Sequence, residues 1–323
     1  MSRAAERIIS VGGGKGGVGK SLVSTNLAIA MAQEGQRVVL VDADLGASNL
    51  HTLLGLERPG PTLQSFLEHE VESLEEARVE TNVPGLSLVR GASAVVGSAN
   101  ISHGQKQRLL RHLRDLTADV VVVDVGAGTG FNQVDLFDVG DLKLAVMTPQ
   151  LTSIQNAYAF VKGTVYRRLG RLMKTHGLEG ALAEKHDGPG HEMASLRAVL
   201  RDVFAASPAL EAEVRRELSR FRLRLFGNQV YDPREAGVFR AVGKMMTDFL
   251  SVAAPLLGFA RASRLMHDSA TQRRPYLLLA KHEESALALR AAARALLQEP
   301  LEEESPSVGR GVPAPMTAET AAA

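Results

Sequence analysis

Val11-Gly-Gly-Gly-Lys-Gly-Gly-Val-Gly-Lys-Ser21 is the stretch of sequence that decides the fold. From Gly14 to Ser21 it reads G-x-x-x-x-G-K-S, which is the spacing of a phosphate-binding loop. Glycines let successive backbone N–H groups converge on an anion, Lys20 can reach the β- and γ-phosphates of a nucleotide, and the Ser21 hydroxyl can ligate Mg²⁺. The stretch therefore predicts a nucleotide site, with a structural Gly-rich turn as the alternative.

The flanks of this loop favour the nucleotide site. The residues before it, 7–11, form a short β-branched run, and residues 22–33 carry apolar side chains at helical spacing. A strand that turns through such a loop into a helix is the context in which the motif binds phosphate.

The composition limits what kind of protein this is. The chain has 323 residues, a hydrophobic fraction of 45% and a net charge of +1, which fits one α/β domain with an insertion and demands no nucleic-acid partner. It contains no cysteine, which excludes disulfides, thiolate catalysis and Cys-ligated zinc or iron–sulfur clusters. The start lacks an apolar signal core and no run of about 18 apolar residues occurs, so we expect a soluble, cytoplasmic protein.

Carboxylates stand at the ends of two further strand-like runs. Asp42 and Asp44 follow the apolar run 37–41, and Asp124 ends the apolar run that begins at Asp119. Side chains at the carboxyl ends of parallel strands point into the crevice where open α/β sheets bind ligands, and a carboxylate there can order the waters around a nucleotide-bound Mg²⁺. The alternative for Asp42 and Asp44 is that both cap the following helix.

Lys15 gives the loop a second lysine, in the pattern K-G-G-V-G-K-S. This pattern resembles the signature-lysine, or deviant, Walker A motif of the MinD/ParA family of P-loop ATPases (SIMIBI class), and the chain is most similar to its MinD and FlhG-like members. Residues 45–55 resemble the family's switch I, residues 119–124 its Walker B strand, residues 125–130 the FlhG switch II, and Thr148-Pro-Gln-Leu-Thr-Ser153 its next turn. Gln150 stands where the family pattern has a glutamate, which leaves the local electrostatics open.

The resemblance implies a doubly wound, mostly parallel α/β sheet in a single P-loop ATPase domain over residues 6–298. It also implies slow, Mg²⁺-dependent ATP hydrolysis by an ATP-dependent homodimer that positions a cellular cargo through a protein partner, with Lys15 reaching the partner subunit's phosphates. Residues 299–323 cannot bury enough apolar surface to order themselves, so we expect a disordered tail.

The resemblance also implies a site, carried over position by position. The catalytic residues are Lys15, Lys20 and Asp44, of which Asp44 positions the attacking water. The nucleotide-binding residues are Gly14, Lys15, Gly16, Gly17, Val18, Gly19, Lys20, Ser21, Leu22, Asn49 and Asn228, and those of the Mg²⁺ shell are Ser21, Asp42 and Asp124. Asn49 is expected to stabilise the switch, and Asn228 to recognise the adenine edge unless it only forms a turn beside Gly227. Leu22 replaces a frequent Thr or Ser, so the α-phosphate contact rests on backbone amides.

The chain departs from the family pattern between residues 163 and 220. We predict a helical insertion there, with helices over 192–205 and 208–220, and a further helix over 62–76. The arginines at positions 167, 168, 171, 215, 216, 220, 222 and 224 indicate mixed charge on solvated helices or, alternatively, a face for DNA phosphates, acidic lipid or an acidic partner.

Two other functions compete with the dimerisation switch. One is a nucleotide-occupancy scaffold with negligible hydrolysis, and the other is a ParA-like ATPase that rides nonspecific DNA. The basic amphipathic helix by which MinD and FlhG attach to membranes has no match near the end of this chain, so membrane association is not carried over.

Overall fold

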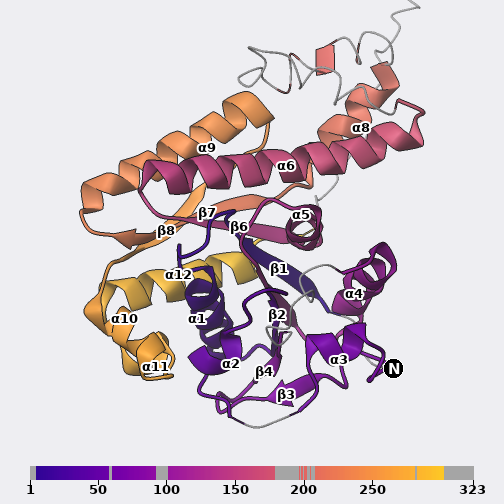
Figure 1. Ribbon diagram of the computed structural model, residues 1–323. Coiled ribbons are helices and arrows are strands. Elements are labelled where there is room, and N and C mark those ends of the chain that lie inside the picture. Colours follow the sequence, from indigo (N-terminus) through magenta and orange to yellow (C-terminus); the bar gives the residue numbers. More distant parts are fainter. Residues whose placement is uncertain are drawn as a thin grey trace, which may run out of the picture.

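The computed structural model describes residues 5–57, 60–91, 101–178, 196, 198, 200, 201, 204, 208–280 and 282–301. An eight-stranded sheet runs through its centre in the order β3-β4-β2-β5-β1-β6-β7-β8 (Figure 1). All neighbouring strands pair in parallel except β3 and β4, which are antiparallel. The strands are β1 (Arg7–Gly12), β2 (Val38–Ala43), β3 (Arg78–Glu80), β4 (Leu86–Val89), β5 (Val120–Val125), β6 (Leu142–Met147), β7 (Leu223–Val230) and β8 (Leu256–Arg261).

Helices cover both faces of the sheet, which is why its central strands are continuous runs of Val, Ile and Leu (Figure 1). One apolar core lies between the sheet and α3 (Leu63–Leu67), α4 (His103–Asp115), α5 (Phe131–Asp138), α6 (Leu151–Thr175), α8 (Pro208–Ser219) and α9 (Ala236–Leu250). The other lies beneath α1 (Lys20–Gln33), α2 (Leu50–Leu53), α10 (Arg264–Thr271), α11 (Tyr276–Leu279) and α12 (Glu284–Gln298). The 3₁₀ turn η1 (Pro233–Glu235) precedes α9. The predicted doubly wound α/β fold is confirmed.

The strands place the phosphate loop by close backbone contact. A Cβ on Gly13 would lie 2.2 Å from the carbonyl oxygen of Val146 in β6, and one on Gly14 would lie 2.5 Å from the carbonyl oxygen of Asn156 in α6. Real Cβ atoms do not approach backbone oxygens this closely, so these two positions require glycine. The loop that follows β1 is therefore packed directly against β6 and α6.

Two sequence expectations need correction or extension. The helix expected over 62–76 ends at Leu67, because His69 adopts a left-handed backbone conformation (φ 63°) and the guanidinium of Arg108 binds the carbonyls of Phe66, Val71 and Glu72. Helix α6 runs unbroken through residue 163, so the start of the predicted insertion lies inside a regular helix. The helix predicted over 208–220 is confirmed as α8, whereas most of the one over 192–205 lies outside the described residues.

The arginine-rich region is largely mixed charge, as the first of the two interpretations expected. Arg167, Arg168 and Arg171 bind the carboxylates of Asp135 and Asp138 on the neighbouring α5. Arg215 pairs with Glu211 on its own helix. The 25-residue α6 is not apolar enough to cross a membrane, and no other helix in the described ranges is both long and apolar enough.

Candidate functional site

The phosphate loop turns from β1 into α1 through three left-handed glycines. Gly14, Gly17 and Gly19 have φ angles of 73°, 79° and 86°, which residues with a side chain rarely adopt. Gly19 is the N-cap of α1 and, as a glycine, has no side chain with which to cap the backbone N–H groups of that helix. The first turn of α1 therefore presents free donors and the positive end of its dipole, which is the arrangement that binds phosphate.

Lys20 lies folded over the loop. Its Nζ donates to the carbonyl oxygen of Lys15 at 3.1 Å, and the residue is only 7% exposed. Burial lowers the pKa of Lys20, and the nearby carboxylates of Asp124 and Asp44 oppose that shift. A buried ammonium held by a single carbonyl oxygen is available to an incoming phosphate.

Asp42 and Asp124 lie side by side at the tips of β2 and β5, where the two strands pair them in register. Burial raises the pKa of Asp124 to about 7, and the negative charge of Asp42 adds to this, while the hydroxyls of Ser21 and Ser24 and the charge of Lys20 act the other way. The Oδ1 atom of Asp124 is buried and has no hydrogen-bond partner in the described part of the chain. Such an atom is rare, and here it lies at the place where the sequence predicted the Mg²⁺ shell.

Asp42 and Asp44 organise the loop between β2 and α2. The Oδ2 atom of Asp42 accepts hydrogen bonds from the Ser48 hydroxyl and from the backbone N–H groups of Asn49 and Leu50. The Oδ1 atom of Asp44 accepts from the N–H groups of Gly46 and Ala47. Asp42 thus contacts the first N–H groups of α2, as the alternative interpretation expected, whereas Asp44 binds loop residues that precede that helix. Burial raises the pKa of Asp42 despite its hydrogen bonds. The roles of both aspartates toward Mg²⁺ and water stay predictions.

The loop between β5 and α5 contacts both the phosphate loop and Asp44. The N–H of Gly128 donates to the carbonyl oxygen of Gly14 at 2.7 Å. A Cβ on Gly126 would lie 2.9 Å from Oδ1 of Asp44. This loop is the one predicted as switch II. If it moves, its contacts with the phosphate loop and with Asp44, the carboxylate proposed to position water, must change.

Asn228 lies against the phosphate loop from β7. Its Nδ2 donates to the carbonyl oxygen of Val18 at 2.8 Å, and its buried Oδ1 has no partner among the described residues. The next residue, Gln229, has a left-handed backbone (φ 54°), and its Nε2 donates to the carbonyl oxygen of Gly17 at 3.2 Å. The pairing of β7 with β8 shifts by one residue at this point, so that two consecutive side chains face the loop.

The remaining predicted residues lie on the rim. Lys15 donates from Nζ to the Thr152 hydroxyl at 2.8 Å, at the start of α6. Asn49 is exposed and its side chain makes no hydrogen bond to a described residue, while Leu22 borders a small recess with Leu53 and Tyr276. Sequence reasoning missed Thr152, Ser24 and Gln229. Of these three, only Ser24 could have been inferred from the sequence, because it lies one helical turn after Lys20 and therefore on the same face of the predicted helix.

This strand–loop–helix cradle at the carboxyl edge of a parallel sheet, with buried carboxylates on the adjacent strand tips, defines a P-loop NTPase. A family model named ParA, described as the NUBPL iron-transfer P-loop NTPase, matches residues 4–167, half of the chain. The chain therefore belongs to the ParA/NUBPL family of P-loop NTPases. It has none of the cysteines that would hold an iron–sulfur cluster.

Individual proteins also resemble this chain, in sequence or in fold. The chain is 39% identical over 158 residues to the antiactivator FleN of Pseudomonas aeruginosa, covering 48% of this chain and 55% of FleN. It is 34% identical over 161 residues to the flagellum site-determining protein YlxH of Helicobacter pylori, covering 48% and 53%. The septum site-determining protein MinD of Pyrococcus horikoshii, solved with Mg-ADP, has the same fold, with a TM-score of 0.61 at 19% identity over 90% of this chain and 96% of that one. The chain thus spans about half the length of the relatives that it matches in sequence.

Proposed function

We propose that this protein is a slow, Mg²⁺-dependent ATPase in which ATP binding drives the formation of a homodimer. The observation that carries the proposal is a pair of buried groups beside the first turn of α1: Asp124 Oδ1, which has no partner among the described residues, and the Lys20 ammonium, whose hydrogen bond there goes to the carbonyl oxygen of Lys15. Unpaired buried polar groups destabilise a protein unless a ligand completes them.

Each residue then has a defined task. The amides of residues 16–21 and the ammonium of Lys20 bind the β- and γ-phosphates. Ser21, Asp42 and Asp124 hold the hydrated Mg²⁺, which when bound neutralises charge on the phosphate oxygens. Asp44 orients the attacking water, and the unpartnered Oδ1 of Asn228 accepts a hydrogen bond from the adenine amino group. These are tasks of positioning and charge stabilisation, which is what phosphoryl transfer to water requires.

Exposed apolar side chains at the carboxyl edge of the sheet support dimerisation through that edge. Phe131, Leu151 and Tyr231 are 68%, 68% and 72% exposed, and each follows the carboxyl end of a parallel strand beside the phosphate loop. Exposed aromatic and leucine side chains around a site are typical of interface cores. Lys15, on the same rim, is released from Thr152 and reaches the phosphates bound by the partner subunit.

The biological role is the positioning of a cellular component, for which the names of the relatives are the support. YlxH and MinD are described as site-determining proteins and FleN as an antiactivator. The ATPase domain extends over residues 6–298 and carries a helical insertion, and the difference between the nucleotide-bound and nucleotide-free states directs the cargo.

Phosphate release, nucleotide-induced stabilisation and dimer mass test the proposal together. The parent protein should gain several degrees in melting temperature with Mg-ATP, form a dimer by light scattering and release phosphate slowly. Lys20→Ala should lose the thermal shift, and Asp44→Ala should keep the shift and the dimer while phosphate release falls at least about tenfold. Equal phosphate release from parent and Asp44→Ala would favour the nucleotide-occupancy scaffold, and an unchanged melting temperature of the parent would refute nucleotide binding.

A further inference from the structure

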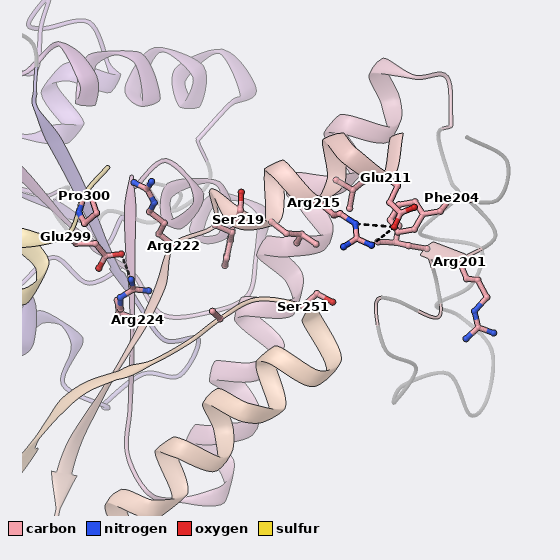
Figure 2. A pocket seen from close by; sticks show the side chains of 15 residues that line it. Arg201, Phe204, Glu211, Arg215, Ser219, Arg222, Arg224, Ser251, Glu299 and Pro300 are labelled. Carbon is pink, nitrogen blue, oxygen red and sulfur yellow. Dashed lines mark hydrogen bonds and ion pairs between the residues drawn. The ribbon is translucent and has the colours of Figure 1, made fainter. Parts of the chain in front are cut away.

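A second recess lies at the edge of the sheet opposite the phosphate loop. It has a volume of about 1380 Å³ and lies between α8, the residues that lead into β7 and β8, and the end of α12 (Figure 2). Every residue that lines it comes from position 200 or later, outside the segment matched by the family model. We call this recess the α8 groove. It is a feature of this chain's own second half.

The floor of the α8 groove is apolar. Val214 and Phe221 are buried beneath it, and Leu218 and Phe204 are half-buried along it. The walls are open to solvent, since Ser219, Ala253 and Pro300 are exposed. An open recess with an apolar floor offers buried area to side chains that enter from outside.

Four arginines surround that floor, and among the described residues carboxylates pair with two of them. Arg215 is paired with Glu211, and Arg224 is paired with Glu299, as the dashed lines in Figure 2 show. Arg201 and Arg222, which Figure 2 places toward opposite ends of the groove, form no ion pair with another described residue. The groove therefore carries a surplus of positive charge on either side of an apolar centre.

The backbone fixes the position of Arg222. The N–H of Lys143 in β6 donates to the carbonyl oxygen of Arg222 at 2.9 Å, and the Nζ of Lys143 lies 4.9 Å from the centre of the Phe221 ring. Arg222 thus stands at the entrance to a parallel strand pair rather than on a loop. These contacts hold the backbone of Arg222, and its half-buried side chain can pair with a carboxylate that enters the groove.

We propose that the α8 groove binds an acidic, amphipathic peptide segment of a partner protein. Leucine-like side chains of the segment cover Leu218 and Phe204, and its carboxylates pair with Arg201 and Arg222. A flat membrane surface cannot enter the recess, and a single acyl chain favours an enclosed tunnel. Glu211 and Glu299 in the walls repel a phosphate backbone.

The inference does not depend on the proposed ATPase function. The groove lies at the amino ends of β7 and β8, whereas the phosphate loop lies at the carboxyl ends of the parallel strands. A dimer formed through Phe131, Leu151 and Tyr231 leaves both grooves open. Partner and nucleotide can therefore be bound at the same time.

The test uses fluorescence anisotropy with the full chain and a designed probe. The probe is a fluorescein-labelled peptide of about four helical turns, with leucines at i, i+3, i+4 and i+7 and glutamates on either side. We expect micromolar binding that weakens as salt is added. We also expect affinity to fall at least about tenfold for Arg222→Gln and for the matched probe with glutamine in place of glutamate.

Arg264→Gln is the matched control variant, because Arg264 is 94% exposed on α10. It should bind the probe as the parent does, and so should Lys20→Ala, which separates this proposal from nucleotide binding. Melting temperatures within a few degrees of the parent show that the variants are folded. The proposal is overturned by absence of probe binding, by equal binding to Arg222→Gln and the parent, or by tighter binding of oleate or duplex DNA than of the probe.

Discussion

Asp124 on β5 and Asp135 on α5 are both buried carboxylates, but they differ in their hydrogen-bond partners and in the direction in which their pKa is shifted. Asp124 ends β5 with its Oδ1 buried and unpartnered in the described structure, and burial raises its pKa to about 7. Asp135, on the helix that follows, also has little exposed surface but binds the Lys106 ammonium at 2.6 Å and the guanidinium groups of Arg167 and Arg171 at 3.0 and 3.4 Å. Burial raises the pKa of Asp135 too, but the hydrogen bonds from Arg167 and Lys106 outweigh it and lower that pKa overall.

The difference shows how a P-loop domain divides its buried charge. Where a charge fastens helices to one another, every acceptor has a donor and the arrangement stabilises the fold. Where a charge is to bind a ligand, as we propose for Asp124, one of its atoms has no partner in the described structure, and the energetic penalty lasts until the ligand binds. Replacing such residues should therefore change stability in opposite directions at the two places.

The largest change is expected for Asp135→Ala. Removing this carboxylate leaves the ammonium of Lys106, only 6% exposed, without its partner, and breaking a buried pair in this way costs about 3 kcal/mol. Urea denaturation measures the loss. Asp268→Ala, which breaks only an exposed pair with Arg264, serves as control and should change the free energy of unfolding by less than about 0.5 kcal/mol. If both variants lose the same small amount of unfolding free energy, the ion pairs of Asp135 do not stabilise the packing of α5 against its neighbouring helices.

Asp124→Asn should act in the other direction on the nucleotide-free protein. The folded-state pKa of Asp124 is about 7, above its ordinary value of 3.8, so the folded parent binds a proton that the unfolded chain has lost. The parent's stability should consequently fall as the pH rises from about 4 through 7. The variant should lack this fall and be more stable than the parent at pH 8 by about 2 kcal/mol.

Urea titrations of both proteins at several pH values without nucleotide give the comparison. With Mg-ATP present the order should reverse, because the variant gives up the carboxylate of the metal shell. If the stabilities of parent and variant depend on pH in the same way, the proposal that Asp124 is a destabilising buried carboxylate in the nucleotide-free protein is wrong.

The smallest change is expected at Lys143, a buried charge whose hydrogen bond goes to a neutral group. Its Nζ donates to the Gly140 carbonyl at 2.6 Å, and burial lowers its pKa to about 8. Because the unfolded chain keeps its proton up to the ordinary value of 10.5, the parent's stability should rise with pH between about 8 and 10.5. Lys143→Met should remove this rise and add about 1 kcal/mol at pH 7. A loss of stability at pH 7 would show that the carbonyl bond outweighs the burial penalty.

Much of the fold is predictable from local sequence, because the buried strands are uninterrupted apolar runs and the phosphate loop is a contiguous motif. β3 could not be predicted in the same way, since Arg78-Val79-Glu80 is short, half-exposed and ordered mainly by pairing with β4. The helix expected over 62–76 failed because an arginine from α4 binds its terminal carbonyls, and no local pattern shows such a contact.

The candidate site likewise has a part that the local sequence predicts and a part that it does not. Lys20, Asp42 and Asp124 were predictable because they stand at strand ends and within a motif. The bond from Lys15 to Thr152 joins residues 137 positions apart, and the α8 groove brings residues near 200, 221 and 299 together. Only the three-dimensional packing reveals such combinations. The arginines in the sequence left an acidic partner as one of several alternatives. They could not show that, within the described part of the chain, Arg224 pairs with a carboxylate and Arg222 does not.

The extra residue in β7 has a consequence beyond local geometry. In a regular strand the side chains of Asn228 and Gln229 would point to opposite faces, yet here both donate to the phosphate loop. Insertion or deletion of one residue in β7 would therefore turn one of these amides away from the phosphate loop while leaving every residue of the loop in place. With the adenine role that we propose for Asn228, base preference can change through the length of this strand, independently of the motif that binds the phosphates.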